Sequence, residues 1–283
     1  MERLSLNEVD PYPGKSTFDQ IPDLLNEEYL AARAFSIFPI IYGERGDFAV
    51  TAMTYFRWVD DLIDKNGLSY EGKVKFIKRQ EELHMEGLPR NAYEIERRYH
   101  SFYDLMGPCV GEIREKATIL LGCIKRDFNH QGYKARTYRE IRHDNIRTLS
   151  TCIEAVAFIL NQKPMKPTKK FVNMVDYWAT LGSLSDLQED IERGMLQVPF
   201  SREEVEEINS KRNERERKML ALKIYDEERF NKEKQRAIDG LRQNAYSFLQ
   251  LDMPFWQKVL STIYIRVREP IKLRREVTYP IRL

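Results

Sequence analysis

The sequence predicts an all-α protein, a single-domain helical bundle, from three observations. Apolar residues recur at helical spacing through most of the 283 residues, and no stretch shows the alternation typical of strands. Only 13 glycines and 12 prolines interrupt the chain, several where helices are expected to end. The hydrophobic fraction of 42% is enough to bury a core. No linker marks a boundary, so we expect an irregular N-terminal segment over residues 1–20 and one all-α domain over residues 21–283.

The first expected helix begins after Asn26, an N-cap followed by two glutamates, and ends near Phe38. The second runs over residues 44–65 with an apolar stripe on one face, and the Asn66-Gly67 turn ends it. Further helices are expected over residues 69–86, 92–105, 109–129, 136–161 and 168–193.

The last part of the chain carries clear start and stop signals. Gly194 is expected to end the 168–193 helix, and Ser201 with Glu204 forms a capping-box pattern for the next. Two or three helices should then complete the chain to about residue 268. The charged stretch over residues 202–236 predicts a solvated outer helix.

Composition excludes several functional classes. Lys+Arg at 46 against Asp+Glu at 44 leaves a net charge of +2, which does not indicate a nucleic-acid surface. The three cysteines lack metal-ligand spacing and fit a reduced cytoplasmic protein better than a disulfide scaffold. The start of the chain predicts no signal peptide, and no apolar stretch approaches the ~18 residues of a membrane span. We therefore expect a cytoplasmic protein, with peripheral membrane contact as the alternative.

Three aspartates, Asp60, Asp61 and Asp64, lie in the segment RWVDDLID over residues 57–64. Asp60 and Asp64 are spaced i, i+4 and project from one helix face. Negative charge at a helix C-terminus opposes the macrodipole, and the flanking residues are bulky and apolar, so solvated surface acids explain the pattern poorly. A divalent cation explains it better, because Mg²⁺ prefers oxygen ligands. Arg57 could clamp a phosphate oxygen or simply neutralise the acids.

A second acidic segment, DLQEDIERG, repeats the i, i+4 spacing at Asp186 and Asp190. Alone it is equally well explained as an exposed acidic helix end, because Glu189 and Glu192 add further acids. Paired with the first segment it favours metal binding, because two acidic faces turned toward each other repel unless cations lie between them. Mg²⁺ ions that bridge a diphosphate would fill that role. The expected metal ligands are Asp60, Asp61, Asp64, Asp186 and Asp190.

The segments AFS (34–36) and YFRWVDDLID (55–64) resemble the first aspartate-rich motif of squalene and phytoene synthases. DLQED (186–190), with the following ERG and VP, is similar to their second motif, and IYI (263–265) matches a family helix. The resemblance spans about residues 30–268. It implies the isoprenoid synthase fold, a helical bundle around a central apolar cavity. It also implies a prenyltransferase that condenses two farnesyl or geranylgeranyl diphosphates head to head through a cyclopropyl intermediate and releases diphosphate.

The same resemblance implies cofactors, partners and site residues. Mg²⁺ or Mn²⁺ is the implied cofactor, and use of NADPH is left open. The partner is a prenyl diphosphate, with no nucleic acid, and the protein could be a monomer or a dimer. The implied catalytic residues are Arg57, Asp60, Asp64, Asp186 and Asp190. The implied substrate-binding residues are Phe35, Tyr55, Arg57, Asp61, Tyr264 and Arg282.

The region of the second motif departs from the family pattern. Ala179, Gly182 and Ser185 stand where the family carries Gln, Asn and Arg, of which the Asn helps to hold metal and the Arg helps to hold diphosphate. Asp144 falls near the position of a family Tyr. It is either an extra polar group for the cavity or one half of a surface pair with His143.

These departures leave two alternative functions open. A class I terpene synthase or lyase would ionise a single prenyl diphosphate on the same scaffold. A non-catalytic relative would keep the fold as a lipid-binding or assembly factor, although buried acids without metal are costly to keep. The basic C-terminal tail is likewise open to two interpretations. It is either a solvated tail that leans on an anionic membrane or the carrier of Arg282, which by spacing corresponds to a family diphosphate-binding Arg.

Overall fold

The structure is a computed structural model, and it describes residues 38–64, 69–129, 132–252, 254–263, 265, 266 and 279. Nearly all secondary structure in this part of the chain is helical, which confirms the all-α prediction. Of the helices described, none is both long enough and apolar enough to cross a bilayer. Residues 26–37 of the first expected helix and the Asn66-Gly67 turn lie outside the described residues. The expected helix end near Phe38 is wrong, because residues Phe38–Tyr42 are helical.

The chain divides into two compact units. The first comprises Met1–Phe128 and Cys152–Pro164, and the second comprises Asn129–Thr151 and Met165–Leu283. One domain over residues 21–283, with a central apolar cavity, stays a prediction.

The first unit consists of helices joined by short turns. Its described elements are α3 (Phe38–Tyr42), α4 (Glu44–Asp64), α5 (Tyr70–Glu86), α6 (Glu94–Ser101), α7 (Tyr103–Met106), the 3-10 helix η2 (Gly107–Cys109), α8 (Val110–Asn129) and the last part of α9 (Tyr138–Asn161).

The second unit contains the rest of α9 and the C-terminal helices. Its described elements are β1 (Arg136–Thr137), α10 (Lys169–Ser185), α11 (Leu187–Glu192), β2 (Pro199–Phe200), α12 (Arg202–Asn209), α13 (Glu214–Ile224), α14 (Glu227–Asn244), the 3-10 helix η3 (Ala245–Gln250) and α15 (Phe255–Ile263).

Local signals place many helix ends where the sequence predicts them. Helix α4 begins at Glu44, directly after Gly43, whose φ of +55° suits glycine. The Ser69 side chain caps α5 by accepting from the Gly72 N–H at 3.1 Å. The predicted capping box is present, because Ser201 accepts from the Glu204 N–H and the Glu204 carboxylate accepts from the Ser201 N–H.

Two expected helices are interrupted. The 92–105 helix divides at Phe102, whose N–H bonds to the Tyr99 carbonyl in a 3-10 pattern while its ring stacks on Phe48 at 5.2 Å. The 168–193 helix divides at Asp186, which adopts φ −89° and ψ 0°. The backbone bonds on either side of Asp186 persist, from its N–H to Gly182 at 3.0 Å and from the Asp190 N–H to Asp186 at 2.8 Å. This second interruption is therefore a local bend.

The prediction of a single outer helix over residues 202–236 is wrong. Helices α12, α13 and α14 occupy this stretch, because Asn213 and Asp226 provide new N-caps to the N–H groups of Glu216 and Arg229. With α15, the described part after residue 200 has more helices than the two or three expected.

The expectation of no strands also needs a small correction. Arg136–Thr137 pairs in parallel with Pro199–Phe200, and this two-residue ladder delays the start of α9 to Tyr138. The start of α9 is fixed by a reciprocal pair of bonds. The Glu140 carboxylate accepts from the Thr137 N–H at 2.8 Å, and the Thr137 hydroxyl accepts from the Glu140 N–H at 3.3 Å.

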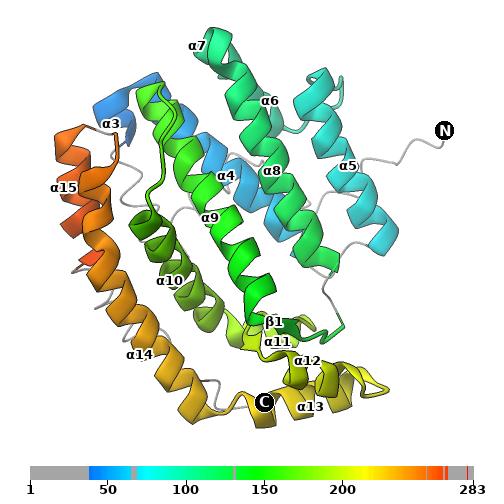
Figure 1. Cartoon of the computed structure of the whole chain (residues 1–283). Helices are drawn as coiled ribbons and strands as arrows, with labels where there is room; N and C mark the ends of the chain where they lie inside the picture. The colour runs from blue at the N-terminus through cyan, green and yellow to red at the C-terminus, as the bar shows by residue number, and fades with distance from the viewer. Residues whose placement is uncertain are drawn as a thin grey trace. The chain divides into compact units, whose positions relative to one another are not determined.

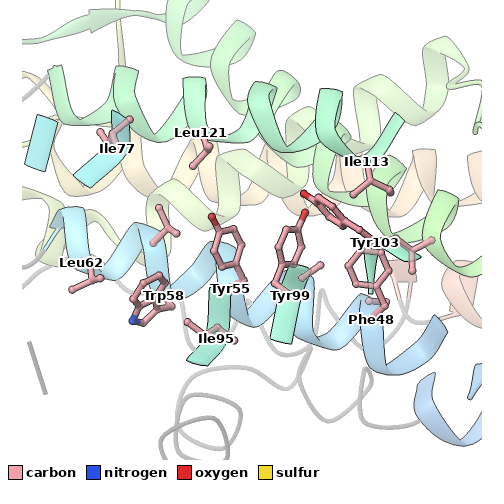
Figure 2. Close-up of a cluster of buried hydrophobic side chains, with 14 of the residues drawn as sticks. Phe48, Tyr55, Trp58, Leu62, Ile77, Ile95, Tyr99, Tyr103, Ile113 and Leu121 are labelled. Atoms are coloured by element: carbon pink, nitrogen blue, oxygen red, sulfur yellow. The ribbon is translucent and has the colours of Figure 1, made fainter. Parts of the chain in front are cut away.

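The core of the first unit is a row of aromatic side chains along α4 (Figure 2). Tyr55 stacks on Tyr99 at 4.5 Å between ring centroids, and their hydroxyl ends point to the same side. Trp58 meets Phe76 edge to face at 5.5 Å. Such pairs contribute about 0.5–1.5 kcal/mol each beyond the area they bury, so this row fixes the face that α4 turns inward.

A chain of buried hydrogen bonds crosses this core. The Tyr55 hydroxyl donates to the Gln80 carbonyl oxygen at 2.6 Å, because the amide nitrogen of Gln80 donates to Glu96 at 2.8 Å. His84 Nε2 lies 3.2 Å from the same hydroxyl, and its Nδ1 lies 2.7 Å from the Tyr103 hydroxyl. The order of donors therefore places the proton of neutral His84 on Nε2, with Nδ1 accepting from Tyr103.

His84 should make the protein sensitive to acid. Burial, with the positive charges of His100 and Arg114, lowers the pKa of His84 from 6.5 to about 3. The unfolded chain takes up a proton near pH 6.5, whereas the folded protein does not. Stability is therefore complete above pH 6.5 and falls as the pH drops toward 3, by about 1.4 kcal/mol per pH unit.

Urea unfolding at pH 7, 5.5 and 4 should show this slope. His84→Gln should lower the free energy of unfolding at pH 7, but its decrease with falling pH should be smaller by about 1.4 kcal/mol per pH unit, the contribution of one proton. An unchanged pH dependence would show that His84 is not its source.

In the second unit, α10 and α14 lie side by side (Figure 1). Gly240 permits their close approach, because a Cβ at this position would lie 2.4 Å from the Tyr177 ring. Phe171 of α10 and Phe248 of η3 meet edge to face at 5.9 Å. These contacts fix α10, the helix that leads into the second acidic segment.

Candidate functional site

The first aspartate group lies on the last two turns of α4. Val59, Leu62 and Ile63 are buried in the core, so helical spacing leaves the three aspartates on the other side of the helix. The side chains of Asp60 and Asp61 are 37% and 13% exposed. The sequence correctly predicted that these carboxylates border a buried segment.

Arg57 is placed against these aspartates. Its guanidinium lies 3.6 Å from Asp60 and 3.2 Å from Asp61, and 39% of its side chain is exposed. Ion pairs at this exposure contribute little to stability. They hold the guanidinium against the two carboxylates.

Negative charge accumulates around Asp60. Burial, followed by the charge of Asp64, raises the pKa of Asp60 from 3.8 to about 8; Arg57 opposes the shift, and Asp61 and Asp127 add to it. Water screens part of this repulsion, because 37% of the side chain is exposed. The pKa of Asp60 is therefore raised, and an added cation would favour its ionised form.

Asp127 and Cys152 interact electrostatically with Asp60 and were not predicted from the sequence. Asp127, near the end of α8, acts on Asp60 from a second helix. The charge of Asp60 also acts on Cys152 of α9. Burial is the main cause that raises the pKa of the Cys152 thiol to about 12, and the charges of Cys123 and Asp60 add to it. The i, i+4 pattern could not reveal either residue, because both contacts are long-range in sequence.

The other predicted substrate contacts are placed less favourably or lie outside the described residues. Tyr55 is fully buried, and its hydroxyl bonds to Gln80 and His84, so its side chain is part of the core of the first unit. A contact between Tyr55 and substrate stays a prediction. Phe35, Tyr264 and Arg282 are outside the described part of the chain.

The second aspartate group spans the bend between α10 and α11. Asp186 is exposed, whereas the Asp190 side chain is buried at 8% exposure. Glu189 is exposed and forms an ion pair with Arg193. The interpretation as a solvated acidic end thus fits Glu189, and a buried carboxylate such as Asp190 needs polar or ionic partners.

The positions that depart from the family pattern are accommodated without strain. Gly182 has open space where a Cβ would be, and Ser185 is exposed. The Asn145 amide donates to the Ser183 hydroxyl at 3.4 Å, which joins α9 to α10 within the second unit.

Asp144 has a partner that the sequence did not indicate. The buried Arg136 of β1 forms a short ion pair with Asp144 and also donates to Gln197 at 3.1 Å. His143 lies 3.3 Å from Asp144 and is 66% exposed, so the predicted pair exists as well. Arg136 lies just before α9 in sequence, in the strand β1 that pairs with β2.

The five predicted metal ligands belong to two different units. Within the described residues, no group of three or more His, Cys, Asp or Glu side chains converges on one point as a ready-made metal site. Asp60, Asp61 and Asp64 belong to the first unit, and Asp186 and Asp190 belong to the second. Their joint action on a metal therefore stays a prediction.

Comparisons with known proteins add nothing to this description. No family model, no curated protein and no solved structure matches the chain. The resemblance to squalene and phytoene synthases thus depends on the motif residues alone.

Proposed function

We propose that this protein is a Mg²⁺-dependent prenyltransferase that joins two isoprenoid diphosphates head to head. The observation that carries the proposal is the excess of carboxylates around Asp60. Burial raises the pKa of Asp60, the charges of Asp64 and Asp61 on α4 and of Asp127 on α8 raise it further, and that of Arg57 lowers it. Such a group gains from binding a divalent cation and, through it, a diphosphate.

In this proposal each residue has a defined task. The aspartates would hold Mg²⁺, which would supply electrophilic stabilisation of the departing diphosphate. Arg57 donates to a diphosphate oxygen as the allylic C–O bond breaks and the electron pair leaves with the diphosphate. The double bond of the second prenyl chain attacks the resulting cation, and loss of a proton closes the cyclopropane ring. Exclusion of water by apolar walls protects the cation.

The test is diphosphate release by the purified protein. With farnesyl or geranylgeranyl diphosphate, release should require Mg²⁺ or Mn²⁺ and should stop in chelator. The product should carry twice the carbon count of the substrate. Release at the full rate in chelator would overturn the proposal, as would no turnover of any prenyl diphosphate together with no metal-dependent thermal shift.

Product mass also decides between two enzymatic outcomes. The second motif lacks three polar groups of the family pattern, at Ala179, Gly182 and Ser185. This absence favours ionisation of only one substrate as the second candidate function. A cyclic or linear hydrocarbon of unchanged carbon count would identify a terpene synthase on the same scaffold.

Replacement of Arg57 by Ala should lower the rate of diphosphate release about a hundredfold, or ~3 kcal/mol, because a charge-assisted clamp on the leaving group is lost. Arg57→Lys should recover part of the loss, and Lys78→Ala, at a 73% exposed position of α5, should behave as wild type. If Arg57 only neutralises the acids, Arg57→Ala should instead bind Mg²⁺ more tightly and keep a near wild-type rate.

A further inference from the structure

Helix α13 presents two cations and a methionine along one exposed face. Arg215, Met219 and Lys223 are spaced i, i+4 and i+8, so they follow one another along about 12 Å of the helix surface. All three are exposed, and Met219 is 64% exposed. They border an open groove of about 800 Å³, the α13 groove, whose other lining residues are Lys211, Glu216 and Leu220.

The cations of the α13 groove are not neutralised within the described part of the chain. No carboxylate in that part forms an ion pair with Lys211, Arg215 or Lys223. The acid of the groove, Glu216, accepts from the Asn213 amide at 2.9 Å and so takes part in the start of the helix. Cations around an exposed apolar side chain favour a partner that combines negative charge with apolar surface.

Residues of α13 that do not line the groove hold the helix in the second unit. Arg217 donates to the Gly132 carbonyl at 3.3 Å. The Lys218 ammonium lies over the Tyr133 ring at 6.0 Å, and Ala221 is buried. Because these positions fix the helix, the cations of the groove are available to a partner.

We propose that the α13 groove docks on an anionic lipid surface, with lipid phosphates at Lys211, Arg215 and Lys223 and with Met219 at the ends of the acyl chains. A stable protein interface takes about 20–30 residues on each side, whereas six residues line this groove. A fluid lipid surface adapts to a small patch, and each Lys or Arg near it adds to the attraction.

The shape of the basic side chains fits this partner. Lysine and arginine place their charge at the phosphates while their methylene stems stay beside apolar neighbours, here Met219 and Leu220. The proposal depends on α13 alone. It would hold for a protein that turns over no prenyl diphosphate, so it stands or falls separately from the proposed function.

The test is sedimentation of the full-length protein with lipid vesicles. The protein should bind phosphatidylcholine vesicles that contain about 30% phosphatidylserine, and it should be released at about 0.5 M salt, because salt screens the attraction. It should not bind pure phosphatidylcholine. Inorganic phosphate at constant ionic strength should not compete, because a membrane presents many phosphates at once. Equal binding to both kinds of vesicle, or release by phosphate, would overturn the lipid assignment.

Substitutions in the groove identify the docking residues. Lys211→Gln, Arg215→Gln and Lys223→Gln together should weaken binding to the anionic vesicles by about a hundredfold, from roughly fivefold for each cation. Met219→Gln should weaken it about tenfold, because an apolar contact is lost. None of these side chains is buried, so the variants should fold and keep the thermal stability of the wild type.

The matched control removes the same net charge from exposed lysines elsewhere in the second unit, as Lys166→Gln, Lys169→Gln and Lys170→Gln together. It should bind the vesicles like wild type. Equal losses in the two triple variants would reveal an effect of net charge alone and overturn the groove. Binding to polyglutamate that is tighter than binding to the vesicles, and that only the groove variant loses, would overturn the lipid assignment in favour of an acidic protein.

Discussion

Asp60→Asn and Asp64→Asn should each reduce Mg²⁺-dependent diphosphate release by about a thousandfold, or ~4 kcal/mol of transition-state stabilisation. An amide offers one neutral oxygen where the carboxylate offers two charged ones, so the cation loses both charge and a ligand. Neither change should disturb the core, because the Asp60 side chain is 37% exposed and lies opposite the buried face of α4. The rates should be measured at saturating Mg²⁺ and over a Mg²⁺ titration.

A second readout separates metal binding from catalysis. Wild-type protein should gain thermal stability on addition of Mg²⁺ with an unreactive diphosphate, by mass action, and both variants should lose that gain. Removal of one like charge should also make the variants slightly more stable without metal, because the repulsion at Asp60 falls. The control is Glu82→Gln on α5, a 52% exposed carboxylate of the same unit. A wild-type rate in Asp60→Asn would refute the assignment of the first aspartate group.

The parts of this structure that the sequence predicted correctly depend on local signals. Ser69, Ser201 and Gly43 mark helix ends through bonds or dihedral angles within a few residues of themselves. The inward face of α4 follows from periodicity, which a single segment reveals.

The parts that it missed depend on contacts between distant segments. Asp127 acts by its charge on Asp60 from another helix, and the Asn209 side chain bonds to the backbone of Ala135, 74 residues earlier. The interruption at Phe102 accompanies packing of its ring on Phe48. No pattern within one helix contains this information.

Tyr55 shows that one sequence motif can contain both core residues and candidate site residues. The resemblance to squalene and phytoene synthases implied that it contacts substrate. The structure places it in a buried hydrogen-bonded chain with Gln80 and Glu96, so in the first unit it links α4 to α5 and α6. The same network leads to the largest expected effect on stability.

Glu96 is the charged end of that network. Its side chain is fully buried, and its carboxylate accepts from the Gln80 amide at 2.8 Å and from the Tyr93 N–H at 2.7 Å. The Arg79 guanidinium forms a short ion pair with it and lies over the Tyr93 ring at 5.0 Å. The single carboxylate thus caps α6 and neutralises a cation from α5.

Glu96→Ala should lower the free energy of unfolding by about 3–5 kcal/mol, because it removes the acceptor of the Arg79 cation, of the buried Gln80 amide and of the partly buried Tyr93 N–H. Glu96→Gln keeps the size of the side chain and can still accept a hydrogen bond, so it should cost less. The two values should be compared by urea denaturation at pH 7, with Glu82→Ala, at a 52% exposed position of α5, as the surface control.

A double-mutant cycle identifies the source of the loss. If the cost of Glu96→Ala comes mainly from the stranded Arg79 cation, then Arg79→Met together with Glu96→Leu should recover a large part of it, because two apolar side chains leave no buried charge. Each single replacement should be more harmful than the pair. If the two losses of stability simply add, the coupling energy between Arg79 and Glu96 is close to zero. The stability of this part of the first unit would then depend on the hydrogen bonds to Gln80 and Tyr93, which the double variant still lacks.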